Sequence, residues 1–142
     1  MNNEDYVTYN QAQALKKAGF DYPCYFYYTK EDAPDGCVWH TTSEEAPIDY
    51  NRSVYAGCSM PTLAQAQKWL RENKETTVVI YPQIIDSPVE YSLGDEWYYS
   101  VWVGRDIYEA SDTKDKYFDT YESALSAGIT AALKLINHNQ TA

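Results

Sequence analysis

The sequence has few of the residues on which chemical sites are most often built. It holds three cysteines, two histidines and six singly scattered glycines in 142 residues. His40 and His138 are too few for a zinc site, and no Cys-x-x-Cys or His-Glu-x-x-His spacing is present. A Gly-rich phosphate loop and a Gly-x-Ser-x-Gly elbow are absent as well. We therefore predict no catalytic residue, no cofactor and no metal, and we do not expect an enzyme.

Long apolar runs and an export signal are also missing. No eighteen consecutive residues are apolar, so the sequence predicts no membrane-spanning helix. The acidic start at residues 1–5 lacks the apolar region of a signal peptide. The odd cysteine count (Cys24, Cys37 and Cys58) suits free thiols in a reducing compartment. We expect a soluble, cytoplasmic protein without a disulfide and without membrane contact.

Basic residues are scarce, at 11 Lys and Arg against 21 Asp and Glu, which gives a formal net charge of -10. The excess is concentrated in residues 86–122, which hold ten acidic and three basic side chains. Binding to a phosphate backbone requires clustered Lys and Arg, and an acidic field repels it. The sequence therefore predicts no direct binding to nucleic acid.

Two groupings of reactive side chains have plainer explanations. His40 and Cys58 could pair as base and nucleophile, but we expect instead a strand histidine and an inert thiol. Adjacent carboxylates at Glu4-Asp5, Glu31-Asp32, Glu44-Glu45 and Asp95-Glu96 are typical of solvated loops. A small-ligand or catalytic pocket between sheet and loops remains an open hypothesis, to be recognised by acidic groups with perturbed pKa values.

The residues that are abundant favour one folded domain over residues 1–142. Hydrophobic residues make up 44% of the chain and aromatic residues 15%. A chain of this length can bury most of its apolar surface without a metal or a disulfide.

Three helix starts share a sequence signal. Thr8–Gln11 and Thr62–Gln65 match the capping box, and Thr120–Ser123 is a weaker version of it. The first helix is expected to end at Ala18, before Gly19. Apolar residues at helical spacing predict the third helix from Tyr121 to Ile136.

Gly128 interrupts the apolar stripe of that third helix. Because glycine costs about 1 kcal/mol relative to alanine within a helix, Gly128 predicts a close backbone approach to a sheet.

Strand-like runs lie between the helices. Residues 24–29 and 37–42 flank the turn residues 33–36 and predict a hairpin. Further strands are expected at 76–81, ended by Pro82, and at 97–103 and 107–110. Two stretches are expected to be irregular loops, namely 43–59 and 83–96.

This order is helix, two strands, helix, three strands, helix. Short turns between strands favour antiparallel pairing, so the predicted class is α+β. We expect a mainly antiparallel sheet of about five strands, with the three helices packed on one face.

Three phrases of the chain carry a resemblance: "DYPCYFYY", "PTLAQAQKWLREN" and "FDTYESALSAGITAALKLI". With them the chain resembles a family of small uncharacterised proteins of phages and integrated mobile elements of gut Bacteroidales bacteria. The resemblance spans most of the chain but is weak between about residues 76 and 115. It implies an intracellular setting on a mobile element, and it brings no activity and no site residues.

Aromatic side chains occupy both faces of two predicted strands. Successive side chains alternate along a strand, so Trp97, Tyr99, Val101 and Val103 share one face, and Tyr98, Ser100 and Trp102 share the other. Tyr25 and Tyr27 likewise oppose Cys24, Phe26 and Tyr28 on the earlier strand. If helices cover one face, the rings of the other must meet solvent, a loop or a partner. The candidate interface residues are Tyr25, Tyr27, Tyr98 and Trp102.

Two functional hypotheses follow. The first is an accessory protein that binds another protein, or a second copy of itself as a homodimer, through an aromatic sheet face free of helices. The alternative is an acidic protein that mimics nucleic acid and inhibits a DNA- or RNA-acting enzyme, which rests on the acidic block at 86–122. Binding by such a mimic should weaken steeply with salt, whereas binding through aromatic rings should persist.

Overall fold

The computed structural model describes residues 5–29, 38–40, 47–52, 57–86 and 91–140. Three helices and six strands occur in these ranges. Their bounds are α1 (Tyr9–Ala18), β1 (Phe26–Tyr28), β2 (Val38–His40), β3 (Cys58–Ser59), α2 (Leu63–Asn73), β4 (Thr76–Asp86), β5 (Tyr91–Val103), β6 (Asp106–Ala110) and α3 (Tyr121–Gln140). The short 3-10 helices η2 (Tyr50–Arg52) and η3 (Asp112–Lys114) lie between them.

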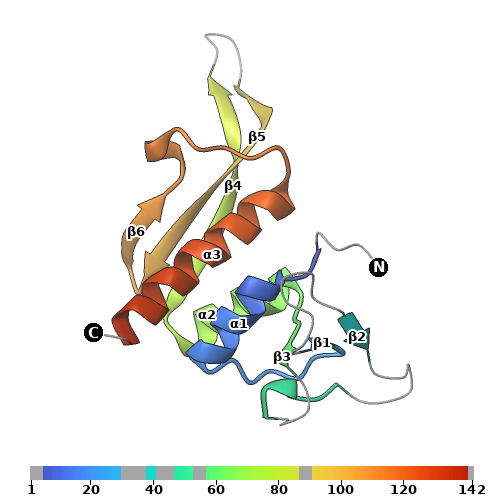
Figure 1. Ribbon diagram of the computed structural model, residues 1–142. Helices are drawn as coiled ribbons and strands as arrows, with labels where there is room; N and C mark the ends of the chain where they lie inside the picture. The colour runs from blue at the N-terminus through green and yellow to red at the C-terminus, as the bar shows by residue number, and fades with distance from the viewer. Residues whose placement is uncertain (1–4, 30–37, 41–46, 53–56, 87–90, 141–142) are drawn as a thin grey trace.

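The strands form two antiparallel sheets of three strands each, with orders β2-β1-β3 and β4-β5-β6. This confirms the α+β class and the three helices, but the expected single sheet is divided. The helices cause the division, because α1 packs against β3 and α2 packs against β4. As Figure 1 shows, α1 and α2 lie between the small sheet and the large one. Only α3 lies broadly across β4 and β5.

The predicted helix caps are present. The hydroxyl of Thr8 accepts from the backbone N–H of Gln11 at 3.2 Å. In return, the side-chain oxygen of Gln11 accepts from the backbone N–H of Thr8 at 2.8 Å. Thr62 and Gln65 form the same reciprocal pair at the start of α2. Gly19 follows α1 with φ 100°, the left-handed conformation that favours glycine at a helix end.

Strand β4 does not end at Pro82, as we had expected, but continues to Asp86 opposite β5. The ladder shifts register between Pro82 and Ile84, which is a position where a residue without an N–H is tolerated. Trp97, opposite Pro82, directs its N–H and C=O to Phe118 instead. Much of the predicted loop 83–96 is therefore sheet.

The other loop and the first hairpin differ less from expectation. Strands β1 and β2 pair antiparallel from Phe26–His40 to Tyr28–Val38, as predicted, although each is shorter. The turn at 33–36 and Cys37 lie outside the described residues. The segment 43–59 contains η2 and β3 in its described part.

Gly128 lies where α3 meets the large sheet. A Cβ atom at this position would lie 2.6 Å from Val78 Cγ1 and 3.2 Å from Tyr99 Cβ. Real Cβ atoms do not approach so closely, so only glycine fits without a shift of the core. The predicted close approach to a sheet is confirmed.

Gln11 joins α1 to α3 on the side of α3 opposite Gly128. Its amide nitrogen donates to Ser126 O, Ser126 Oγ and Thr130 Oγ1 at 2.9 to 3.0 Å, while its oxygen caps α1. The side chain is buried, so each of these bonds replaces water. One residue thus starts α1 and fixes it against α3.

We expect Gly128→Ala to lower the free energy of unfolding by about 1–2 kcal/mol, because overpacking outweighs the better helix propensity of alanine. A Val78→Ala background removes the closest contact of the added methyl group, so the same change should cost clearly less there. Denaturant unfolding of the four proteins of this cycle measures the effect. Equal losses in both backgrounds would contradict the packing account.

Gln11→Ala should destabilise the protein by about 2 kcal/mol more than Gln65→Ala. Both changes remove a capping-box glutamine, but only Gln11 also bonds to another helix in the described part of the chain. Urea denaturation followed by circular dichroism gives both values. Similar losses for the two variants would show that the link to α3 contributes little.

Candidate protein-binding surface

The large sheet has one face covered by α3 and one free of helices. Val78, Tyr99 and Val101 are buried on the α3 side, and Gly128 touches two of them. By alternation the opposite face of β4 and β5 carries Val79, Tyr81, Tyr98 and Trp102. Ile107 of β6 joins them, because it pairs with Trp102 in the ladder. We call these five residues the open face.

Tyr81 and Tyr98 stack across the strands of the open face. Their ring centroids are 5.6 Å apart at an interplanar angle of 28°. Burial, followed by the charge of Asp112 and a hydrogen bond to it, raises the pKa of Tyr81 to about 12. The pKa of Tyr98 is also raised, through burial and then the charge of Glu96. Both rings are therefore neutral phenols with acidic neighbours.

Trp102 is fixed by its own strand. Its indole N–H donates to Ser100 Oγ at 2.9 Å, two residues away on the same face. Ser100 is buried, while Trp102 remains partly exposed. The indole therefore has its polar group satisfied and its ring available for contact.

Aliphatic side chains enlarge this apolar surface. Val79 is 40% exposed and Ile107 is 53% exposed. Beyond the register shift, Ile84 and Leu93 face each other across the strands and are 67% and 70% exposed. These two residues lie in the part of β4 and β5 that extends past the start of α3 in Figure 1. We call this part the arm.

The four predicted interface residues do not lie on one surface. Tyr98 and Trp102 are on the open face, and neither is sealed beneath the chain. Tyr27 belongs to the small sheet, where it packs on Tyr50 with ring centroids 4.5 Å apart. Tyr25 precedes β1 and is half exposed. The division into two sheets separates the two pairs.

Sequence reasoning missed the aliphatic part of the surface. Side chains alternate along the predicted strand 76–81, so Val79 lies on the face opposite Val78 and Ile80. This signal was present in the sequence, but only the aromatic side chains were selected as interface candidates. Ile84 and Leu93 were missed because their segment was expected to be a loop.

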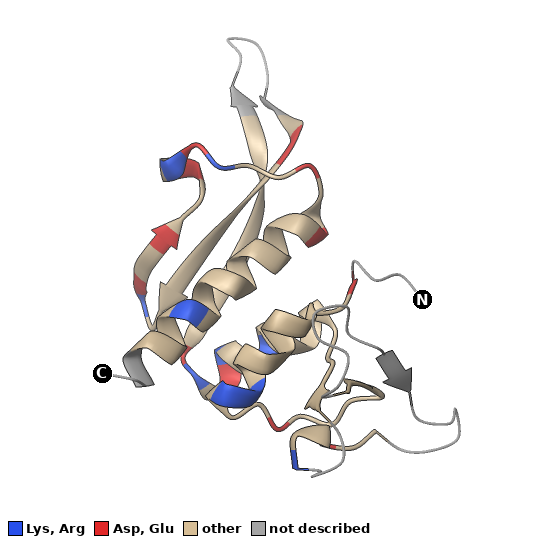
Figure 2. Cartoon of the chain, viewed as in Figure 1, with Lys and Arg blue, Asp and Glu red and all other residues tan. Residues whose placement is uncertain are grey.

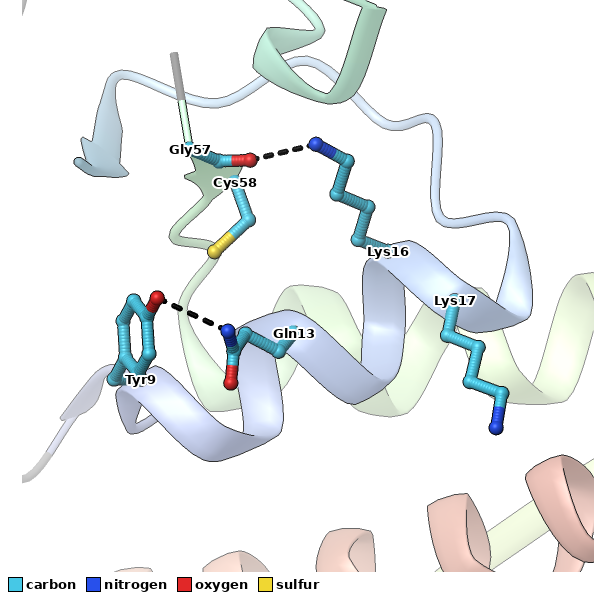
Figure 3. A pocket seen from close by; sticks show the side chains of 6 residues that line it. All are labelled: Tyr9, Gln13, Lys16, Lys17, Gly57 and Cys58. Atoms are coloured by element: carbon cyan, nitrogen blue, oxygen red, sulfur yellow. Dashed lines mark hydrogen bonds between the residues drawn. The ribbon is translucent and has the colours of Figure 1, made fainter. Parts of the chain in front are cut away.

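A cavity of about 440 Å³ lies between α1 and β3, and Figure 3 shows its lining. Lys16 Nζ donates to Gly57 O at 2.7 Å, and Gln13 donates to the hydroxyl of Tyr9 at 3.0 Å. Cys58 is buried beside them, and burial raises its pKa to about 11. At neutral pH it is a thiol rather than a nucleophilic thiolate.

His40 and Cys58 lie on different strands of the small sheet. Strand β1 lies between β2, which carries His40, and β3, which carries Cys58. Two strand spacings separate the backbones of the outer strands by about 10 Å. The two residues are also offset, because they pair with Phe26 and Tyr28 respectively. This backbone arrangement does not favour a base and nucleophile pair.

Within the described ranges, no three His, Cys, Asp or Glu side chains converge as metal ligands. None of the helices described there combines the length and apolar character of a membrane span. No protein-family model, curated protein or solved structure matches the chain.

The tyrosine pair of the open face can be followed by titration. A difference titration against Tyr81→Phe should show one phenol that ionises near pH 12 instead of 10. Asp112→Asn removes a negative charge, so it should lower this pKa, while Asp119→Asn should not. Unfolded tyrosines ionise first, so stability contributed by Tyr81 is present below pH 10 and is lost as the pH rises towards 12. An unchanged transition in Asp112→Asn would contradict the assigned contact.

Proposed function

We propose that the protein acts by binding another protein through the open face and the adjoining arm. The observation that supports this most is the position of the exposed apolar side chains. Val79 and Ile107 lie on the open face, opposite the face that α3 covers, and Ile84 and Leu93 lie in the arm beyond α3. Exposed apolar side chains that gather on one sheet are typical of interaction sites on soluble domains.

The rings of the open face are prepared for contact. Trp102 is bound to Ser100, and Tyr81 is stacked on Tyr98 and bonded to Asp112. Side chains that are already ordered lose little conformational entropy on binding. Tyr and Trp are also the residues most enriched at binding hot spots.

The charges around the open face indicate the chemistry of the partner. Burial and the charges of Glu96, Asp112 and Asp115 raise the pKa of Tyr98, and Figure 2 shows acidic charge on η3. An apolar centre with an acidic rim suits a partner whose surface is apolar and edged by Lys or Arg. The partner we propose is therefore a basic protein or a basic segment of one.

The acidic excess of residues 86–122 also supports a second proposal, that the protein mimics nucleic acid. One of these carboxylates is less available for mimicry, since Glu109 already accepts hydrogen bonds from Tyr99 and Lys114. The mimic would bind by charge alone and lose its partner at high salt. Binding through the open face should persist at roughly 0.5 M salt and above, where the Debye length is only a few Å.

Peptide display against the purified protein tests the proposal. Peptides selected on the native chain should be rich in apolar and basic residues. The double variant Val79→Lys with Ile107→Lys should bind these peptides with an affinity at least about tenfold lower, because two charges enter an apolar centre.

The matched control is Tyr25→Lys with Ile48→Lys, which adds the same charge at exposed apolar positions of the other part of the chain. It should bind the selected peptides like the native protein. Equal losses in the two double variants would count against the open face and in favour of simple charge attraction. Selection of acidic peptides, or complete release by salt, would also argue against it.

A further inference from the structure

A groove of about 630 Å³ runs between β6 and α3, on the side of the large sheet away from the open face. Its walls carry three lysines from separate elements, Lys114 of η3, Lys116 after it, and Lys134 of α3. Figure 2 shows basic residues on η3 and on α3. This convergence occurs in a chain whose net charge is -10.

One carboxylate, that of Glu109, lines this groove, and it already has hydrogen-bond partners. Glu109 accepts from Lys114 at 2.9 Å and from the hydroxyl of Tyr99. These contacts with Lys114 and Tyr99 lower the pKa of Glu109, so it is ionised and balances one lysine. In the described part of the chain, Lys116 and Lys134 have no ion pair within 4.0 Å. The groove therefore keeps an excess of positive charge.

The structural role of cations at a helix end does not account for the cluster. Positive charge near the C-terminal end of α3 stabilises the helix dipole, and this explains His138 and in part Lys134. It does not explain Lys114 and Lys116, which belong to another segment and face α3 across the groove. Like charges that converge on a concave surface attract anions.

Part of the groove lining is apolar. Ala127, Ala131 and Leu135 line it from α3, and the ring of Tyr108 borders it from β6. Tyr108 is 56% exposed, which leaves its ring accessible to a flat group. The volume lies within the range of small-molecule sites.

We propose that this groove binds a small organic anion that carries at least two negative charges and a flat apolar group. The charged end lies against Lys116 and Lys134, and the flat group lies on Tyr108 and the alanines of α3. An aromatic phosphate such as a nucleotide has this chemistry. The proposal is independent of the open face, because the two surfaces lie on opposite sides of the sheet.

Titration calorimetry with ADP, inorganic pyrophosphate and adenosine tests each part of the site. ADP should bind more tightly than either fragment, and pyrophosphate should compete with it. Lys116→Gln with Lys134→Gln should weaken ADP binding by about tenfold or more, the usual effect of losing charged hydrogen bonds. Tyr108→Ala should weaken ADP binding and leave pyrophosphate binding unchanged.

The control is Lys17→Gln with Lys68→Gln, which removes the same charge from α1 and α2. It should bind ADP like the native protein. Absence of ADP binding at millimolar concentration would overturn the proposal, and so would equal losses in the two double variants. Pyrophosphate that binds as tightly as ADP would overturn the part that assigns a flat group to Tyr108.

Discussion

The close contact between α3 and the large sheet determines the rest of this structure. Gly128 removes a Cβ atom from the point where Val78 and Tyr99 approach the helix, so the whole apolar side of α3 reaches the sheet. On its other side α3 receives α1 through Gln11 and also contacts α2. Both sheets therefore depend on one helix, although they share no strand.

This arrangement also decides what the large sheet offers to other molecules. Because α3 occupies one face, the rings of Tyr98 and Trp102 are left on the other. Both rings stay partly exposed there, and the indole N–H of Trp102 is bonded to Ser100. Because α3 does not cover β6 fully, a groove remains along its edge. The two surfaces differ in character, since one is apolar with acidic neighbours and the other is lined by lysines together with a few apolar residues of α3.

The sequence predicted those features that depend on local chemistry. Thr8 and Thr62 begin helices because their capping partners lie three residues away, and Gly128 was informative because it breaks an otherwise apolar stripe. The strands at Phe26–Tyr28 and Trp97–Val103 followed from composition and turn residues, as did the pairing of each with the next strand along the chain. The alternation of Tyr98 and Trp102 with Tyr99 and Val101 was correct for the same reason.

Features that depend on distant contacts could not be predicted in this way. Pro82 signals a strand end locally, but it is tolerated within β4, where the register shifts after it and Trp97 bonds to Phe118 instead. The separation of Tyr27 from Tyr98 follows from helices placed between two sheets, which no single segment specifies. The lysine groove likewise joins residues about twenty positions apart, and their spacing in the sequence gives no hint of it.

The link between Gln11 and Thr130 spans 119 residues and has a consequence for biosynthesis. On the ribosome α1 emerges long before α3, so its buried amide has no partner while most of the chain is made. A short amphipathic helix is marginal alone in water. A chain without α3 would therefore leave the sides of α1 and α2 that pack on it exposed to chaperones and proteases.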